Sequence, residues 1–235
     1  MNNLADSYSR LGQFEEAEKL QVDVVEKRRR LLGEDDLYTV RAMNNLAATY
    51  HDLGRFEEAE KLQVDVLEKR RRLLGDDHPE TLDAMHNLGL TYRYLKQFEE
   101  AAKLYIVEVE KWKQLTDGDH PRTLDVMHDL AKTYDDLGNF EEAEQLKVVV
   151  LEKQKKIFGE DHSDTLLAMN NLGYTNYRMG HLIEAEALLV VALEKRRVLF
   201  GDDHRQTRHV MQNLIKTYHG LGKQAEAAEL EKLLK

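Results

Sequence analysis

Hydrophobic and polar positions along the chain repeat with a period of 42 residues, in units that begin at Met1, Met43, Met85, Met127, Met169 and Met211. Within the second unit, Met43, Leu46, Ala47 and Tyr50 follow an i, i+3, i+4, i+7 spacing. That spacing places them in one stripe on a helix. The pattern predicts a first helix over about residues 39–53.

A second, longer helix is predicted in the same unit after Gly54 interrupts the pattern. The stretch from Phe56 to about Leu74 carries Ala59, Val66 and Leu73 on one side. Together with Leu62 they repeat at helical spacing. Each unit therefore reads as two helices joined by a short turn.

The segment between units carries helix stop and start signals. Gly75 is placed to adopt a left-handed conformation after the second helix, and Pro79 suits the first turn of the next helix, with Asp77 or His78 as its cap. A histidine recurs at the cap position in four units, at His78, His120, His162 and His204. Equivalent residues of stacked repeats lie about 10 Å apart, too far to share a metal ion. We expect helix caps and no metal site.

Two columns keep one residue type in all six units and predict the core. One column is Leu4, Leu46, Leu88, Leu130, Leu172 and Leu214, and the other is Ala17, Ala59, Ala101, Ala143, Ala185 and Ala227. A lone helix pair of this size cannot bury its apolar stripe, so each unit must stack on its neighbours. The prediction is a single all-α solenoid over residues 1–235, with units 1–42, 43–84, 85–126, 127–168, 169–210 and 211–235. Its six helix pairs include a truncated first and a truncated last pair.

The repeated motif resembles the tetratricopeptide (TPR) signature: Met43, Leu46, Ala47 and Tyr50 give M-x-x-L-A-x-x-Y, and a glycine and an aromatic follow. More narrowly, LGDDHPETL, HNLGLTY and FEEAAKLY resemble the long repeats of the kinesin light chain family. Similar arrays occur at the sensor ends of fungal and bacterial nucleotide-binding regulators. The resemblance implies a right-handed α-α superhelix whose first helices line a concave groove that binds protein segments.

The composition and charge of the chain argue against several other functions. A net charge of −10 disfavours binding to a phosphate backbone, and the EKRRR runs at 26–30 and 68–72 read as solvated helix ends that favour the helix dipole. The chain lacks cysteine, a signal peptide and any run of 18 apolar residues, so we expect a cytoplasmic address and no membrane contact. No nucleophile stands beside a base and an orienting group, so neither an enzyme nor a cofactor is expected.

Candidate groove residues lie on the first helices, away from the apolar stripe. The residue before the repeated leucine is an amide in five of six units, and its column gives the candidates Asn45, Asn87, Asp129, Asn171 and Asn213. Such a column could bind the backbone of an extended peptide, or it could simply be inherited from duplication. Variable positions of the same face add Arg41, His86, Arg93, Tyr94, His128, Lys132, Tyr174, Arg178 and Lys216.

The charges on this face predict a groove that is acidic in its middle, around Asp125, Asp129, Asp135 and Asp136, and basic with aromatics toward the C-terminus. The expected function is a scaffold that binds a protein or peptide, as a monomer or as part of a longer chain. Two alternatives stay open. One is the sensor array of a larger signalling NTPase. The other is a designed or consensus repeat, since the segments starting at Leu11 and Leu53 match at 21 of 23 positions.

Several units depart from the repeat pattern. Lys96 stands at a turn position that is otherwise glycine, and Asn176 stands where the other units have tyrosine. Leu182 and Gln224 replace the phenylalanine that opens the second helix elsewhere. We therefore expect looser or specialised packing in the last two units.

Overall fold

The computed structural model describes residues 2–116, 118 and 120–234, except for the side chains of Asn2, Asn3 and Asp6. Within those ranges the chain forms twelve α-helices and no strand. The helices are α1 (Asn2–Arg10), α2 (Phe14–Leu32), α3 (Leu37–Asp52), α4 (Phe56–Leu74), α5 (Pro79–Tyr94), α6 (Phe98–Leu115), α7 (Pro121–Leu137), α8 (Phe140–Phe158), α9 (Ser163–Met179), α10 (Leu182–Phe200), α11 (Arg205–Leu221) and α12 (Gln224–Leu233). The prediction of an all-α chain of helix pairs is confirmed.

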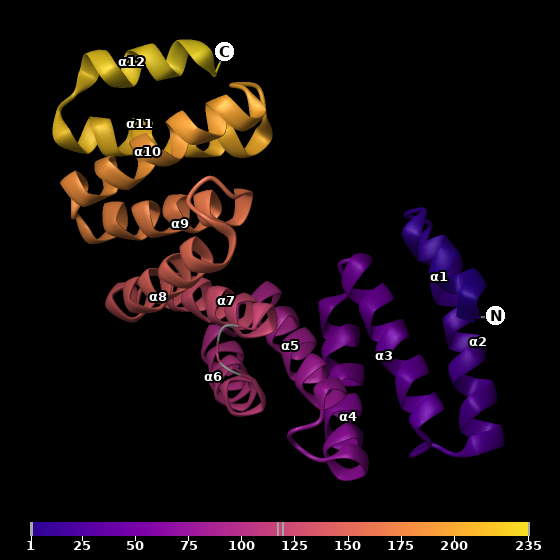
Figure 1. Cartoon of the computed structure of the whole chain (residues 1–235). Helices are drawn as coiled ribbons and strands as arrows, with labels where there is room; N and C mark the ends of the chain where they lie inside the picture. Colours follow the sequence, from indigo (N-terminus) through magenta and orange to yellow (C-terminus); the bar gives the residue numbers. More distant parts are fainter. Residues whose placement is uncertain (1, 117, 119, 235) are drawn as a thin grey trace. The chain divides into compact units, whose positions relative to one another are not determined.

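The helices group into two compact units, residues 1–126 and 127–235. Inside each unit, consecutive helices run in opposite directions and pack against one another, as Figure 1 shows for α9, α10, α11 and α12. Every second helix begins at the position that the 42-residue period predicts, from Phe14 in α2 to Gln224 in α12. No helix in the described ranges is long and apolar enough to cross a membrane.

The two predicted core columns are buried, with one exception. The alanine column has no exposed surface, and the leucines of the later units are at most 5% exposed. Leu4, in contrast, is 51% exposed on α1, which packs mainly against α2. Leu73, near the end of α4, was also expected to face the core, but it is 40% exposed. The position of a residue in a column therefore predicts its burial accurately in the interior of the stack and less accurately at the edges.

Side-chain size is matched between the two helices of a repeat. A Cβ added at Gly89 of α5 would lie 2.7 Å from the Tyr105 ring of α6, and one added at Gly173 would lie 2.8 Å from Cγ of Leu189. The other units carry a larger residue at the glycine position: alanine at Ala5, Ala47 and Ala131, and isoleucine at Ile215. Small and large residues therefore alternate so that the paired helices approach to contact distance.

The histidine caps are confirmed. Nδ1 of His78 accepts a hydrogen bond from the Glu80 amide at 3.1 Å, and His120, His162 and His204 accept equivalent bonds from the amide two residues on. Asp36 has the same role before α3. The glycine that ends α4, Gly75, has a φ of 91° as expected, but its ψ of 165° puts it outside the left-handed helical region. That combination is essentially restricted to glycine.

Lys96 occupies the turn between α5 and α6 with a φ of 60°, the one positive φ at a non-glycine residue in the described ranges. A side chain in this left-handed conformation costs about 1–2 kcal/mol, because Cβ crowds the following carbonyl. We expect Lys96→Gly to raise the free energy of unfolding of the first unit by about 1 kcal/mol, after the greater entropy of an unfolded glycine is subtracted. Urea denaturation followed by circular dichroism measures this change. A variant less stable than the unaltered protein would show that the backbone of Lys96 is not strained.

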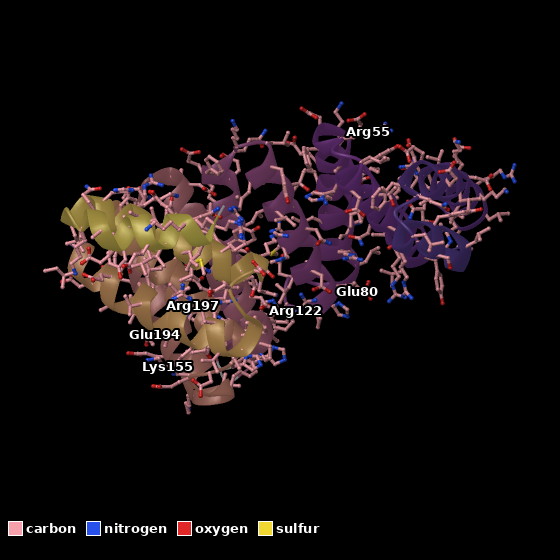
Figure 2. The ribbon with its side chains drawn as sticks, turned by 90° about the horizontal axis from the view of Figure 1, so that it is seen from above. Arg55, Glu80, Arg122, Lys155, Glu194 and Arg197 are labelled. Carbon is pink, nitrogen blue, oxygen red and sulfur yellow. The ribbon has the colours of Figure 1, made fainter. Side chains whose placement is uncertain are left out.

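The EKRRR runs are not wholly solvated, which corrects the prediction. The second basic residue of each run binds a backbone carbonyl: Nη1 of Arg70 donates to the Glu80 carbonyl at 2.6 Å, and Arg28 donates to the Tyr38 carbonyl. Arg70 is only 5% exposed. These guanidinium groups bind the first turn of the next helix and so link consecutive repeats. Lys69 is also buried, whereas Arg71 and Arg72 stay exposed. Figure 2 labels Lys155 on α8 and Glu194 and Arg197 on α10 of the second unit.

Candidate functional site

A hollow of about 450 Å³ opens in the second unit between the first helices of three successive repeats. The helices α7, α9 and α11 form its walls, and one residue of α8, Lys147, forms its floor. The wall residues are His128, Lys132, Asp135, Asp136, Leu167, Asn170, Asn171, Tyr174, Arg178, His209, Asn213 and Lys216. Seven predicted groove residues come together here: His128, Lys132, Asn171, Tyr174, Arg178, Asn213 and Lys216.

Lys147 on the floor belongs to a buried polar cluster with Asp135 and Thr175. The Lys147 ammonium donates to Oδ2 of Asp135, to the Thr175 hydroxyl at 2.5 Å and to the Asn171 carbonyl at 3.4 Å. The Thr175 hydroxyl in turn lies 2.9 Å from Oδ1 of Asp135. Burial lowers the pKa of Lys147, and the Asp135 carboxylate opposes that shift. Asp135 was expected to face a ligand, but its charge is engaged by the floor.

Asn170, the residue next to the amide column, connects the column members Asn171 and Asn213 of two repeats. Nδ2 of Asn213 donates to Oδ1 of Asn170 at 3.0 Å, and Nδ2 of Asn170 lies 3.5 Å from Oδ1 of Asn171. Asn170 and Asn213 are buried, whereas Asn171 is half-buried. The first two amides therefore fix the packing of α9 against α11, and Asn171 is the amide with polar atoms accessible to a ligand.

Two cations lie beside one aromatic ring in the wall. Nζ of Lys216 is 5.5 Å from the centroid of the Tyr174 ring, and the guanidinium carbon of Arg178 is 5.9 Å from it. Arg178 also donates to the Tyr174 hydroxyl at 3.3 Å and lies 4.7 Å from the ring centroid of Phe140. Within the described part of the chain, no carboxylate pairs with Lys132, Arg178 or Lys216. Their positive charge is available to a ligand.

A second hollow of about 910 Å³ lies at the start of α11. It shares Leu167 and His209 with the first and is also lined by Arg205, Arg208 and Asp203. Partial desolvation lowers the pKa of His209, and the positive charges of Lys216, Arg196 and Arg205 lower it further. His209 therefore stands as a neutral donor or acceptor at neutral pH where the two hollows share their lining.

The remaining candidates lie elsewhere. Arg41, Asn45, His86, Asn87, Arg93 and Tyr94 belong to the first unit, and Asp129 of the second unit does not line the hollow. Arg41 forms an ion pair with Glu80 of α5, and Tyr94 stacks on Phe56 with centroids 4.8 Å apart. Asn45, Asn87 and Asp129 are half-buried on their helices. Of the predicted acidic middle, only Asp136 faces the hollow with a carboxylate that the floor does not bind.

His86 is held by a carboxylate that the sequence analysis missed. Oε2 of Glu108 lies 3.4 Å from Nδ1 of His86, and the Trp112 indole donates to Oε1 of Glu108 at 3.3 Å. Glu108 is 2% exposed, and burial raises its pKa, although His86 and Trp112 oppose the shift. The signal was present in the sequence, because the equivalent residues of other repeats are Val24, Val66 and Val150. Lys147 departs in the same way from Gln21 and Gln63.

Sequence profiles described as tetratricopeptide repeat match residues 1–72, 41–106, 123–164 and 165–206. The chain belongs to the tetratricopeptide repeat family. TPR domains generally bind proteins and are typically not catalytic. No curated relative matches the sequence.

Solved TPR structures share the fold of this chain. A putative kinesin light chain from Podosopora anserina with nearly identical TPR-like repeats is 27% identical, with a TM-score of 0.78 over 84% of this chain and 93% of its own. BtubC (BKLC) from P. vanneervenii is 22% identical, with a TM-score of 0.77 over 94% and 89%. The signal transduction ATPase with a TPR sensor from Pyrococcus horikoshii is 17% identical, with a TM-score of 0.70 over 92% and 32%. The expected likeness to kinesin light chain arrays is confirmed at the level of fold.

Proposed function

We propose that this TPR array binds a peptide segment of a partner protein in the hollow formed by α7, α9 and α11. The proposal rests on one observation: seven predicted groove residues from three different repeats line one open hollow. First helices of stacked repeats present their free faces side by side, so a chain laid across them meets one helix after another.

The chemistry of the hollow suits an extended backbone with polar side chains. The half-buried amide of Asn171 offers both a donor and an acceptor, and Tyr174 adds a hydroxyl and an apolar ring. Leu167 supplies an apolar contact at the junction with the second hollow. A bound segment would thus make backbone hydrogen bonds at Asn171 and place neighbouring side chains in the two hollows.

Filling the hollow tests this function. Peptides are selected from a degenerate 12-residue display library on the unaltered protein, and their affinities are then measured for Leu167→Trp by fluorescence anisotropy. We expect an affinity loss of about tenfold or more, because an indole at the junction occupies the space that the peptide requires.

Val198→Trp is the matched control, since Val198 is 87% exposed on α10 of the same unit and does not line either hollow. It should change the affinity less than twofold. Equal affinity of the Leu167→Trp variant and the unaltered protein, or a selection that returns no binding peptide, would refute the proposal.

A further inference from the structure

The hollow has a positive charge in a strongly acidic protein. Four cationic side chains and two carboxylates line it, which gives a formal charge of +2 with neutral histidines, while the whole chain carries −10. The pair between Lys147 and Asp135 accounts for one charge of each sign. Lys132, Arg178 and Lys216 then stand against the single carboxylate of Asp136.

Several basic side chains elsewhere in the array are paired with carboxylates of a neighbouring repeat. Arg55 pairs with Glu18 at 2.7 Å, Lys111 with Asp77 at 2.5 Å and Lys223 with Glu186 at 2.6 Å. The helix α11 departs from this arrangement, because it contains no acidic residue at all, while Lys216 shares the ring of Tyr174 with Arg178. Two like charges beside one ring repel each other, and an anion between them would relieve that repulsion.

We propose that the hollow binds a phosphorylated side chain of a partner peptide, with the phosphate held by Lys132, Arg178 and Lys216. This inference rests on the proposed peptide-binding function. A phosphomonoester carries about −1.5 to −2 charge at pH 7 and offers three acceptor oxygens. The charge thus matches the +2 of the hollow, whereas a single carboxylate would leave an excess positive charge.

The geometry favours a phosphate attached to a chain over a free anion. The basic hollow shares Leu167 and His209 with the larger one, which would accommodate the residues that flank the phosphorylated position. The guanidinium of Arg178 can bind two phosphate oxygens at once, and the two lysines can act as point charges on either side. The Asn171 amide and the Tyr174 hydroxyl add neutral hydrogen-bonding groups within the same walls.

The test compares three degenerate peptide libraries that differ only at a fixed central residue, which is phosphoserine, glutamate or serine. Each library is captured on the immobilised full chain and quantified by mass spectrometry. We expect the phosphoserine library to be recovered about tenfold or more above the serine library, because charge-assisted hydrogen bonds are roughly twice as strong as neutral ones. Millimolar inorganic phosphate should compete with it.

The variant Lys132→Gln/Lys216→Gln should abolish the preference for phosphoserine. Both lysines are exposed, so the core is left intact. The control Lys113→Gln/Lys232→Gln removes the same charge at two exposed lysines that do not line the hollow and should keep the preference.

Equal recovery of all three libraries above an uncoated surface would overturn the phosphate proposal and leave peptide binding standing. Equal recovery of the glutamate and phosphoserine libraries would overturn the requirement for a dianion. No recovery of any library would overturn both proposals. Loss of the preference in the control variant would show that the overall charge of the chain, and not this hollow, selects phosphate.

Discussion

Replacing Arg196 by alanine is expected to lower the free energy of unfolding of the second unit by about 3–5 kcal/mol. Arg196 is fully buried on α10, yet it binds groups on both neighbouring first helices. Its Nη2 donates to the Ser163 carbonyl at 3.1 Å at the start of α9, and its Nη1 donates to Oε1 of Gln206 at 2.5 Å in α11. Truncation would leave both acceptors unpaired and create a void between three helices.

Arg197 provides the control at the next position. It pairs with Asp202 at 2.6 Å near the end of α10, where its side chain is 34% exposed. Solvent screens such a pair, so Arg197→Ala should cost at most about 1 kcal/mol. Chemical denaturation followed by circular dichroism compares the two variants, and hydrogen exchange locates the loss in α9 to α11. Equal destabilisation by both substitutions would show that the buried contacts of Arg196 add no stability beyond that of an exposed ion pair.

The helices and their ends could be predicted from the sequence because the signals are local. The spacing of Met43, Leu46 and Ala47 follows the geometry of one helix, and His78 caps the helix that starts at the next residue. Neither signal depends on how the repeats stack. Repetition strengthened both, since the same pattern returned every 42 residues.

The buried charges could not be predicted from residue type, because a basic residue at a helix end is solvated in most proteins. The column of Arg70 and Arg196 also contains Trp112, which is a core residue in its own repeat. That one member indicates that the column faces inward. Comparing residues down a column is therefore more informative here than reading each charge run along the chain.

Only some residues of the candidate site could be predicted, because the stacking of the repeats decides which of them stay accessible. The members of the amide column share one residue type but not one environment: Asn213 is buried against Asn170, while Asn171 remains half-buried in the wall. Which face of a helix stays open depends on how the next helix pair packs, and that is a property of the stack. The cations were found because Lys132, Arg178 and Lys216 are exposed polar residues on the free faces of their helices.

Replacing Lys147 by methionine is expected to destabilise the second unit by about 3 kcal/mol, because it leaves the Asp135 carboxylate without its cation. The Asp135 side chain is only 11% exposed, so water cannot replace the lost partner fully. The double variant Lys147→Met/Asp135→Asn removes both charges together and should recover most of that stability. Thermal denaturation of the two variants and the unaltered protein measures the difference, and equal losses in both variants would contradict a coupled pair.

The same two variants separate the role of the floor from that of the walls. The double variant keeps the formal charge of the hollow at +2, because it deletes one cation and one carboxylate. Lys147→Met alone lowers that charge to +1 and leaves Asp135 unpaired beside the ligand. If the walls bind phosphate as proposed, the double variant should retain the preference for the phosphoserine library, and the single variant should weaken it. Loss of the preference in both variants would place the phosphate on Lys147 itself, because both lack its ammonium.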